Sequence, residues 1–313
     1  MDLLSDILSR MRLSGTLYFR TSFTSPWGVR VPPFENVSRF HFAHRGRCFV
    51  RVADEPKPVS LEQGDLIIIT RGATHTLYCD PTTESQALPL DLMVEVSGFQ
   101  GSGTLVYGDP GTSHETQLVC GHFAFDKNAN HPLIDALPSH LHIRNYGEAA
   151  GSWMESTLKV IGAEAGRNGM GSDLIALKLS EIIFAQALRT YLASDGADRP
   201  VLAGFSDAQI SRALNAVHNA PEFRWTLEDL AKVAGMSRTS FATKFAQLMS
   251  MTPVAYITHW RMQIARQQLA ETDQAIIDIA ESTGYQSEAA FGRVFKKYFA
   301  TPPARYRRQQ RLD

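Results

Sequence analysis

The pattern of hydrophobic and polar positions divides the 313-residue chain into a strand-rich part followed by a helical part. Between residues 15 and 125, short alternating or fully apolar runs, such as residues 48–52 and 66–70, are separated by glycine and proline at close intervals. Such spacing is typical of an antiparallel sandwich or barrel. Apolar residues then recur with helical periodicity over residues 173–192, and the chain after residue 200 is helical throughout.

A polar stretch at residues 194–200 marks a boundary between these parts. The chain is longer than the size at which one core usually divides, so two compact units are expected. The predicted fold class is an α+β multidomain chain. It comprises an antiparallel β-barrel over residues 1–145, a helical connecting segment and linker over residues 146–200, and an all-helical domain over residues 206–313.

The helical domain contains an internal repeat, in which the two turn glycines are 49 residues apart. In each copy a glycine ends one short helix, a serine caps the next, and two phenylalanines face inward. The first copy has Gly235, Ser237, Phe241 and Phe245, and the second has Gly284, Ser287, Phe291 and Phe295. Two short helices joined by a tight turn form a helix-turn-helix. Thr252 and Pro253 begin the longer helix that separates the two motifs.

The charge of the chain is distributed unevenly. The formal net charge is −1, which taken alone suggests no nucleic-acid partner. Residues 206–313, however, contain 14 Lys and Arg against 10 Asp and Glu, whereas residues 1–205 contain 17 against 22. A basic C-terminal end on an acidic body indicates a polyanionic partner for that end.

The stretch from Trp225 to Tyr306 resembles the paired helix-turn-helix domain of AraC-type bacterial transcription regulators. Beyond the repeat, the matching residues are Leu230, Ala231, Tyr256, Arg261, Met262, Ala265, Leu269, Ile279, Ala280, Lys296, Pro302, Pro303 and Arg307. The resemblance implies a sequence-specific regulator, most often an activator in this family, that binds double-stranded DNA and contacts RNA polymerase. It also implies that the second helix of each motif enters the major groove, at sites about one helical turn apart.

The resemblance places residues of these two second helices at the DNA. They are Arg238, Thr239, Thr243, Lys244, Ser287, Glu288, Ala289, Arg293, Lys296 and Lys297. Arg293 is suited to bidentate contact with guanine, whereas lysines at helix ends more often contact phosphates. The small side chains of Thr239 and Thr243 favour thymine methyl groups or water-mediated contacts. A solvated helix face is the usual alternative for a basic cluster, but the repeat favours DNA here.

Residues 1–200 resemble those members of the family whose sensor is a cupin-like β-barrel. The matching residues are Phe40, His41, Gly46, Gly64, Asp65, Leu66, residues 71–75, residues 118–121, His131, Pro132, Leu133, Leu137 and Pro138. The resemblance implies that the barrel senses a small effector and that the helices after it form a homodimer contact.

His41, His75 and Cys120 are the candidate effector-binding residues, since they lie at motif positions on three separate strands. Together with His122 they would give zinc a tetrahedral site. The alternative is that the histidines are hydrogen-bonded within the barrel and that Cys120 is a small buried hydrophobic residue. No cofactor is required under that alternative, so zinc remains an open expectation.

A reactive thiol among Cys48, Cys79 and Cys120 would instead make the barrel an oxidant sensor. An enzyme is a further alternative, because catalytic cupins hold a metal with histidines two residues apart. Here His41 and His44 are three apart, so a strand would point them to opposite faces. We therefore expect a regulator and no enzyme, with an effector-independent DNA-binding protein as the other rival class.

The sequence also bears on where the protein acts. Its longest unbroken apolar run is far too short to span a bilayer, and its N-terminus lacks the pattern of a signal peptide. A bacterial cytoplasmic location with no membrane partner is expected.

Overall fold

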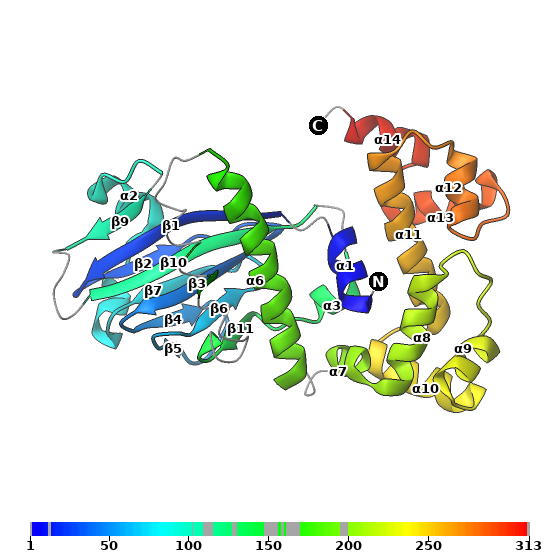
Figure 1. Cartoon of the computed structure of the whole chain (residues 1–313), viewed down its shortest axis with the longest axis horizontal. Coiled ribbons are helices and arrows are strands. Elements are labelled where there is room, and N and C mark those ends of the chain that lie inside the picture. The colour runs from blue at the N-terminus through cyan, green and yellow to red at the C-terminus, as the bar shows by residue number, and fades with distance from the viewer. Residues whose placement is uncertain are drawn as a thin grey trace. The chain divides into compact units, whose positions relative to one another are not determined.

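The computed structural model of the chain (Figure 1) describes residues 2–11, 14–101, 103–108, 115–126, 130–146, 156–157, 160, 170–194 and 200–311. Strands dominate one part and helices the other, which confirms the predicted α+β multidomain fold class. Contacts between residues divide the chain into two compact units. The β unit comprises residues 13–127 and 137–194, and the helical unit comprises residues 1–12, 128–136 and 195–313.

The β unit contains two sheets and the helices that cover them. In spatial order the first sheet is β11 (His140–Ile143), β6 (Leu66–Ile69), β3 (Val37–Arg45), β10 (Glu115–Ala124), β1 (Ser14–Thr24) and β9 (Thr104–Tyr107). The second sheet is β5 (Val59–Leu61), β4 (Cys48–Val52), β7 (His75–Tyr78), β2 (Gly28–Val31) and β8 (Leu88–Pro89). The helices are η1 (Pro81–Gln86), α2 (Leu90–Ser97) and α6 (Ser172–Ser194).

The expected antiparallel barrel is not closed. Within the described residues the strands form two open sheets, and β9 and β8 pair in parallel with β1 and β2. The edge strand β8 contains Pro89, which has no backbone N–H to extend the ladder. Alternation of apolar and polar residues is the same in a sandwich and in a barrel, so the sequence pattern did not distinguish them.

The core of the β unit lies between the two sheets. Val50 and Leu77 of the second sheet and Ile67 of the first are at most 1% exposed and belong to one apolar cluster. On the outer face of the first sheet, α6 packs Phe184 against the ring of Phe123, with ring centroids 4.9 Å apart. The helix predicted over residues 173–192 is confirmed by α6, which in Figure 1 crosses the first sheet.

The helical unit contains the remaining helices. They are α1 (Leu3–Arg10), α3 (Pro132–Asp135), α7 (Pro200–Ser206), α8 (Ala208–Asn219), α9 (Leu227–Ala234), α10 (Arg238–Met249), α11 (Pro253–Glu271), α12 (Ile276–Ser282), α13 (Glu288–Phe299) and α14 (Pro303–Gln310). The boundaries predicted at residues 145, 200 and 206 stay predictions, because much of residues 147–169 and all of 195–199 lie outside the described residues. No described helix is both long enough and apolar enough to cross a membrane.

Three helices of the two motifs begin or end as their local sequences predict, whereas α12 ends at Ser282 with Thr283 as its C-cap, one residue before the predicted Gly284. Gly235 ends α9 in the left-handed conformation, with φ of 69°. The hydroxyl of Ser237 accepts a hydrogen bond from the backbone N–H of Ser240 at the start of α10. Ser287 caps α13 in the same way through Ala290, at 3.2 Å. The two motifs, α9–α10 and α12–α13, are joined by α11.

The two turn glycines differ in what surrounds them, and this gives a prediction. Among the described residues, a Cβ at Gly235 would meet the Arg212 guanidinium alone, at 3.3 Å, so Gly235→Ala should cost about 1 kcal/mol for the left-handed backbone. A Cβ at Gly284, where φ is 79°, would lie 2.8 Å from the carbonyl oxygen of Glu222 and 2.6 Å from Arg261. Gly284→Ala should therefore cost at least about 2 kcal/mol.

Urea unfolding of both variants of the full chain measures this difference. Arg261 has little freedom to withdraw, because its guanidinium donates hydrogen bonds to the carbonyl oxygens of Pro221 and Phe223 at 2.7 and 2.9 Å. Equal losses of stability for the two variants would contradict the packing described at Gly284.

Candidate functional site

The second helices of the motifs, α10 and α13, present the residues predicted to contact DNA. Arg238, Thr239 and Thr243 are exposed on α10. On α13 the exposed residues include Ser287, which caps it, Glu288, Ala289, Arg293, Lys296 and Lys297. Phe241 and Phe245 of α10 and Phe291 and Phe295 of α13 are at most 2% exposed, so the opposite face of each helix is fixed in the core.

Lys244 differs from the other predicted DNA contacts. Its ammonium group lies 2.7 Å from a carboxylate oxygen of Asp207 and donates a hydrogen bond to the side chain of Gln209 at 2.9 Å. Asp207 in turn caps α8 by accepting hydrogen bonds from Gln209 and Ile210. The charge of Lys244 is thus partly neutralised within the protein, and its contact with DNA stays a prediction.

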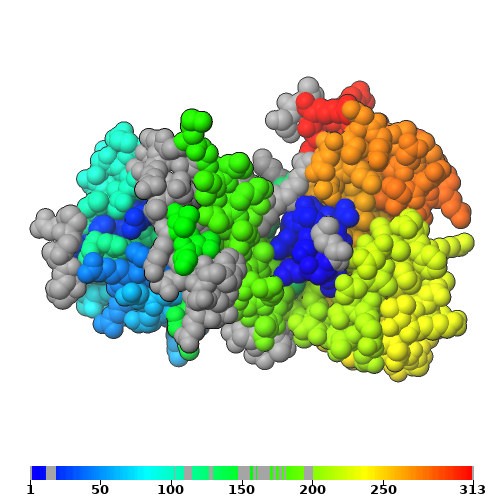
Figure 2. All heavy atoms as spheres, in the orientation of Figure 1, coloured from blue at the N-terminus to red at the C-terminus, as the bar shows by residue number. Residues whose placement is uncertain are grey.

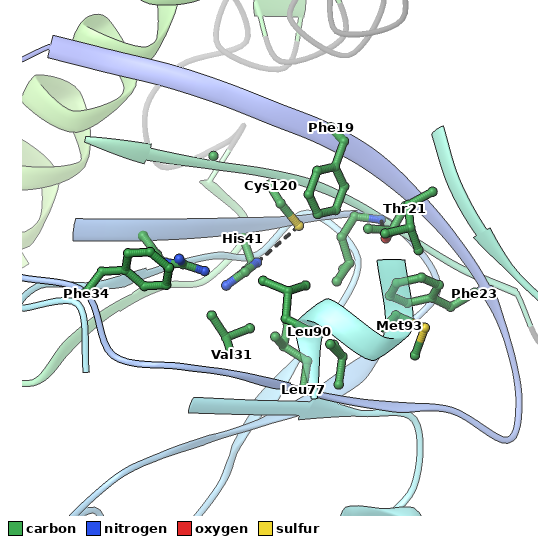
Figure 3. Close-up of a pocket in the computed structure, with 15 residues that line it drawn as sticks. Phe19, Thr21, Phe23, Val31, Phe34, His41, Leu77, Leu90, Met93 and Cys120 are labelled. Carbon is green, nitrogen blue, oxygen red and sulfur yellow. Dashed lines mark hydrogen bonds between the residues drawn. The ribbon is translucent and has the colours of Figure 1, made fainter. Parts of the chain in front are cut away.

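A cavity of about 200 Å³ lies inside the β unit. Figure 3 shows side chains from both sheets and from α2 pointing toward this space. The lining residues are Phe19, Thr21, Phe23, Val29, Val31, Phe34, Arg39, His41, Leu77, Leu90, Met93, Leu105, Leu118, Cys120 and Gly121. Most are aliphatic or aromatic, and such walls suit an apolar guest. An apolar cavity of about 150 Å³ already binds benzene, so this one is large enough for one ring with a small substituent.

His41, His75 and Cys120 are brought together, and His41 and Cys120 line this cavity. His41 lies directly opposite Cys120 in the register of β3 and β10, and its Nδ1 is 3.1 Å from the Cys120 Sγ. The other ring nitrogen of His41, Nε2, is 2.8 Å from Nε2 of His75 on β7. The carbonyl of Ala73 accepts a hydrogen bond from His75 Nδ1 at 2.9 Å.

These contacts fix the positions of the protons. A carbonyl can only accept, so His75 carries its proton on Nδ1 and accepts at Nε2. His41 must therefore donate from Nε2, and its Nδ1 accepts from the Cys120 thiol. Every polar atom in this row is satisfied while all three groups are neutral.

The directions in which burial shifts the pKa values of these groups agree with the neutral arrangement. Burial lowers the pKa of His75 to about 4. Burial, with the nearby His75 and Arg39, holds the pKa of His41 well below its ordinary value. Burial also raises the pKa of Cys120 to about 12 and that of Cys48 further above its usual range. Because the thiolate is the reactive form, neither Cys48 nor Cys120 is activated as a nucleophile here.

The same geometry bears on the expected zinc site. Cys120 and His75 contact opposite nitrogens of the His41 ring, so the three side chains form a row and do not converge on one point. In the part of the chain that the structure describes, no group of three or more His, Cys, Asp or Glu side chains is placed to hold a metal ion. His122 lies two residues beyond Cys120 on β10 and is half-buried. These residues do not fit a shared metal ion.

Several residues of the cavity were not singled out from the sequence. Leu90 and Met93 lie on α2, a helix within the part of the chain that was predicted to be strands. Gly98 ends that helix with φ of 66°, and a glycine after an apolar run was the available signal. Arg39, on the same inward face of β3 as His41, lies over the Phe34 ring, 4.0 Å from its centroid. Its position in an apolar strand gave no signal of a cavity.

Comparison with known proteins agrees with both parts of this architecture. A cupin family model matches residues 2–193, and a helix-turn-helix domain model matches residues 230–309. A Streptomyces lividans protein named as an AraC-like transcription regulator is 32% identical over 312 residues, covering 98% of each chain. The chain belongs to the AraC-type transcription regulators with an N-terminal cupin domain.

Two further proteins are similar to this AraC-type regulator over part of its length. The "RCS-specific HTH-type transcriptional activator RclR" of Escherichia coli is 28% identical over 200 residues, covering 64% of this chain and 70% of RclR. The DNA-binding domain of AdpA, a global transcriptional factor solved in complex with a target DNA, is 26% identical. That match covers 34% of this chain and 95% of the AdpA chain, with a TM-score of 0.32.

Proposed function

We propose that this regulator binds a small, mainly apolar effector in the cavity of the β unit and changes its DNA binding in response. The observation that carries the proposal is the cavity of about 200 Å³ with its aliphatic and aromatic lining. Arg39, His41 and Thr21 supply polarity; both nitrogens of His41 are already engaged, and the Thr21 hydroxyl accepts a hydrogen bond from the backbone N–H of Leu118. A guanidinium only donates hydrogen bonds, so the polar group of the effector should be an acceptor that faces Arg39.

Thermal unfolding of the full chain with single-ring probes tests this proposal. Toluene and benzoate at millimolar concentration should each raise the melting temperature, and benzoate more so, because its carboxylate can accept hydrogen bonds from Arg39. Leu118→Phe fills the cavity from its wall and should remove both shifts. Leu118→Met conserves volume and should keep them. No shift with either probe, or an equal shift in Leu118→Phe, would contradict the proposal.

We propose further that the two exposed helix faces of α10 and α13 read adjacent segments of the major groove, and that the protein activates transcription through contact with RNA polymerase. The word "activator" in the name of RclR supports the direction of regulation. In vitro transcription with RNA polymerase from a promoter that carries the bound DNA tests it. A rise in transcript on adding the protein is expected, and a fall would make it a repressor.

The acting form is proposed to be a homodimer that associates through α6. Leu174, Ile175 and Ile182 of this helix are 60%, 43% and 41% exposed and recur at helical spacing on one side. Ile182→Glu would bury an unpaired charge in that interface on each protomer and should weaken association roughly 100-fold or more. Sedimentation velocity measures the change, and Val96→Glu, at an exposed apolar residue of α2, is the control. A dimer as stable as before would exclude this interface.

Zinc binding and thiol chemistry at Cys120, which lines the cavity, are the alternatives to an apolar effector. Purified protein can be assayed for zinc and for free thiols, with Cys120→Ser alongside. The neutral row of Cys120, His41 and His75 predicts no stoichiometric zinc and slow thiol modification. About one zinc per chain, lost in the variant, would instead establish the metal site.

A further inference from the structure

Two segments that come early in the sequence are part of the helical unit. They are residues 2–11, which include α1, and residues 130–136, which include α3, and together they are called the clasp. Figure 1 shows α1 beside α8 and α11, and Figure 2 shows it, in blue, seated against the helices of its own unit. Arg266 of α11, which is fully buried, donates a hydrogen bond to the carbonyl of Arg10 at 3.0 Å.

A row of hydrogen bonds runs through the buried contact between the clasp and α11. The backbone N–H of Leu133 donates to His131 Nδ1 at 3.2 Å, so His131 must donate from Nε2 to the Tyr256 hydroxyl, also at 3.2 Å. Tyr256 then donates to His218 Nε2 at 2.8 Å, and His218 Nδ1 donates to the Asp6 carboxylate at 2.9 Å. Each hydrogen-bonding direction is fixed by the backbone N–H at one end and the carboxylate at the other.

The clasp also contacts side chains that hold the two recognition helices. Tyr256 packs against Phe245 of α10, with ring centroids 5.9 Å apart. One turn further along α11, His259 donates from Nε2 to the carbonyl of Asn130 at 3.0 Å, and its Nδ1 accepts from the Tyr298 hydroxyl of α13. Because residues 256 and 259 lie on one face of α11, Asn130 and His131 meet both at once.

We propose that His131 is a positioning residue that fixes α13, the recognition helix of the second motif, relative to α10, the recognition helix of the first. The helix-turn-helix family match begins only at residue 230, so this support comes from outside the DNA-binding motif. The His131 ring lies 6.0 Å from the Tyr256 ring and 5.9 Å from the His259 ring, which places it between the side chains that serve the two motifs. Two helices that must enter the groove one turn apart bind together only when their separation is held.

The spacing of two DNA half-sites tests this role. The unaltered full chain first selects its DNA from a random-sequence library. Footprinting then defines the two half-sites, which are the DNA segments bound by α10 and by α13 of one chain. One base pair is inserted between these two segments. We expect the insertion to weaken DNA binding by the unaltered chain about tenfold or more. It should weaken DNA binding by His131→Ala less than about threefold, because two recognition helices that are no longer held at a fixed separation tolerate the wrong spacing. His131→Gln, whose amide can still donate to Tyr256, should restore the discrimination.

The affinity of each variant for DNA with a single half-site separates a positioning role from a simple loss of stability. This affinity should stay unchanged in His131→Ala. Tyr256→Phe keeps the ring contact with Phe245 but lacks the hydroxyl, so it should tolerate the insertion as His131→Ala does, and it decides the question if His131→Ala does not fold. The proposal would be overturned if either folded variant were weakened by the inserted base pair as much as the unaltered chain is. It would also be overturned if a variant lost affinity for a single half-site but remained as sensitive to the insertion as the unaltered chain.

Discussion

Raising monovalent salt from 50 to 200 mM should weaken DNA binding by the full chain about 100-fold. The exposed cations Arg238, Arg293, Lys296 and Lys297 lie on the two recognition helices. If each neutralises one phosphate, the slope of log affinity against log salt is about −3.6, because each contact releases condensed counterions. A fluorescence-anisotropy titration at several salt concentrations measures this slope.

Substitution localises the effect. Lys296→Ala combined with Lys297→Ala should make the slope less steep by about 2. Lys232→Ala is the matched control, because this exposed lysine of α9 lies 3.1 Å from the Glu228 carboxylate and outside the recognition helices. Salt-insensitive binding, or a control that changes the slope as much as the double variant, would contradict this assignment of the DNA-binding face.

Acidification should destabilise the folded chain as pH falls below 6.5. Burial keeps His41, His75 and His131 neutral in the folded state, and it lowers the pKa of each below the ordinary value. An unfolded chain takes up protons at these positions near pH 6.5, so their stabilisation is present above that pH and is lost as pH falls toward the folded-state values. For His75, with a pKa of about 4, the loss between pH 7.5 and pH 5 is about 2 kcal/mol.

Urea unfolding at pH 7.5 and pH 5 measures the total. His75→Gln removes one of the titrating groups while its amide oxygen can still accept from His41, so this variant should show a pH dependence smaller by about 2 kcal/mol. A free energy of unfolding that does not change between the two pH values would show that these imidazoles are not buried as neutral groups.

The sequence predicts the helix-turn-helix motifs well because their boundaries depend on neighbouring residues. Gly235 ends a helix and Ser237 begins the next through contacts within four residues, and both follow from capping preferences. Lys244 shows the limit of this reasoning. Its ion pair with Asp207 depends on packing between α8 and α10, which spacing along the chain does not reveal.

The candidate site was predictable as a set of residues but not as an arrangement. His41, His75 and Cys120 come together as expected, yet whether they converge or form a row depends on the distance between two sheets. The contacts of the clasp could not be predicted from the sequence for the same reason. His131 and Tyr256 are 125 residues apart, and only tertiary packing brings them within hydrogen-bonding distance.

We expect a molecule bound in the cavity of the β unit to change DNA binding by α10 and α13. DNA affinity of the full chain, measured with and without benzoate at a concentration that saturates its effect on melting, tests this claim most directly. We expect DNA affinity to change about fivefold or more in the unaltered protein and not at all in Leu118→Phe. An unchanged DNA affinity in unaltered protein whose cavity is occupied would contradict it.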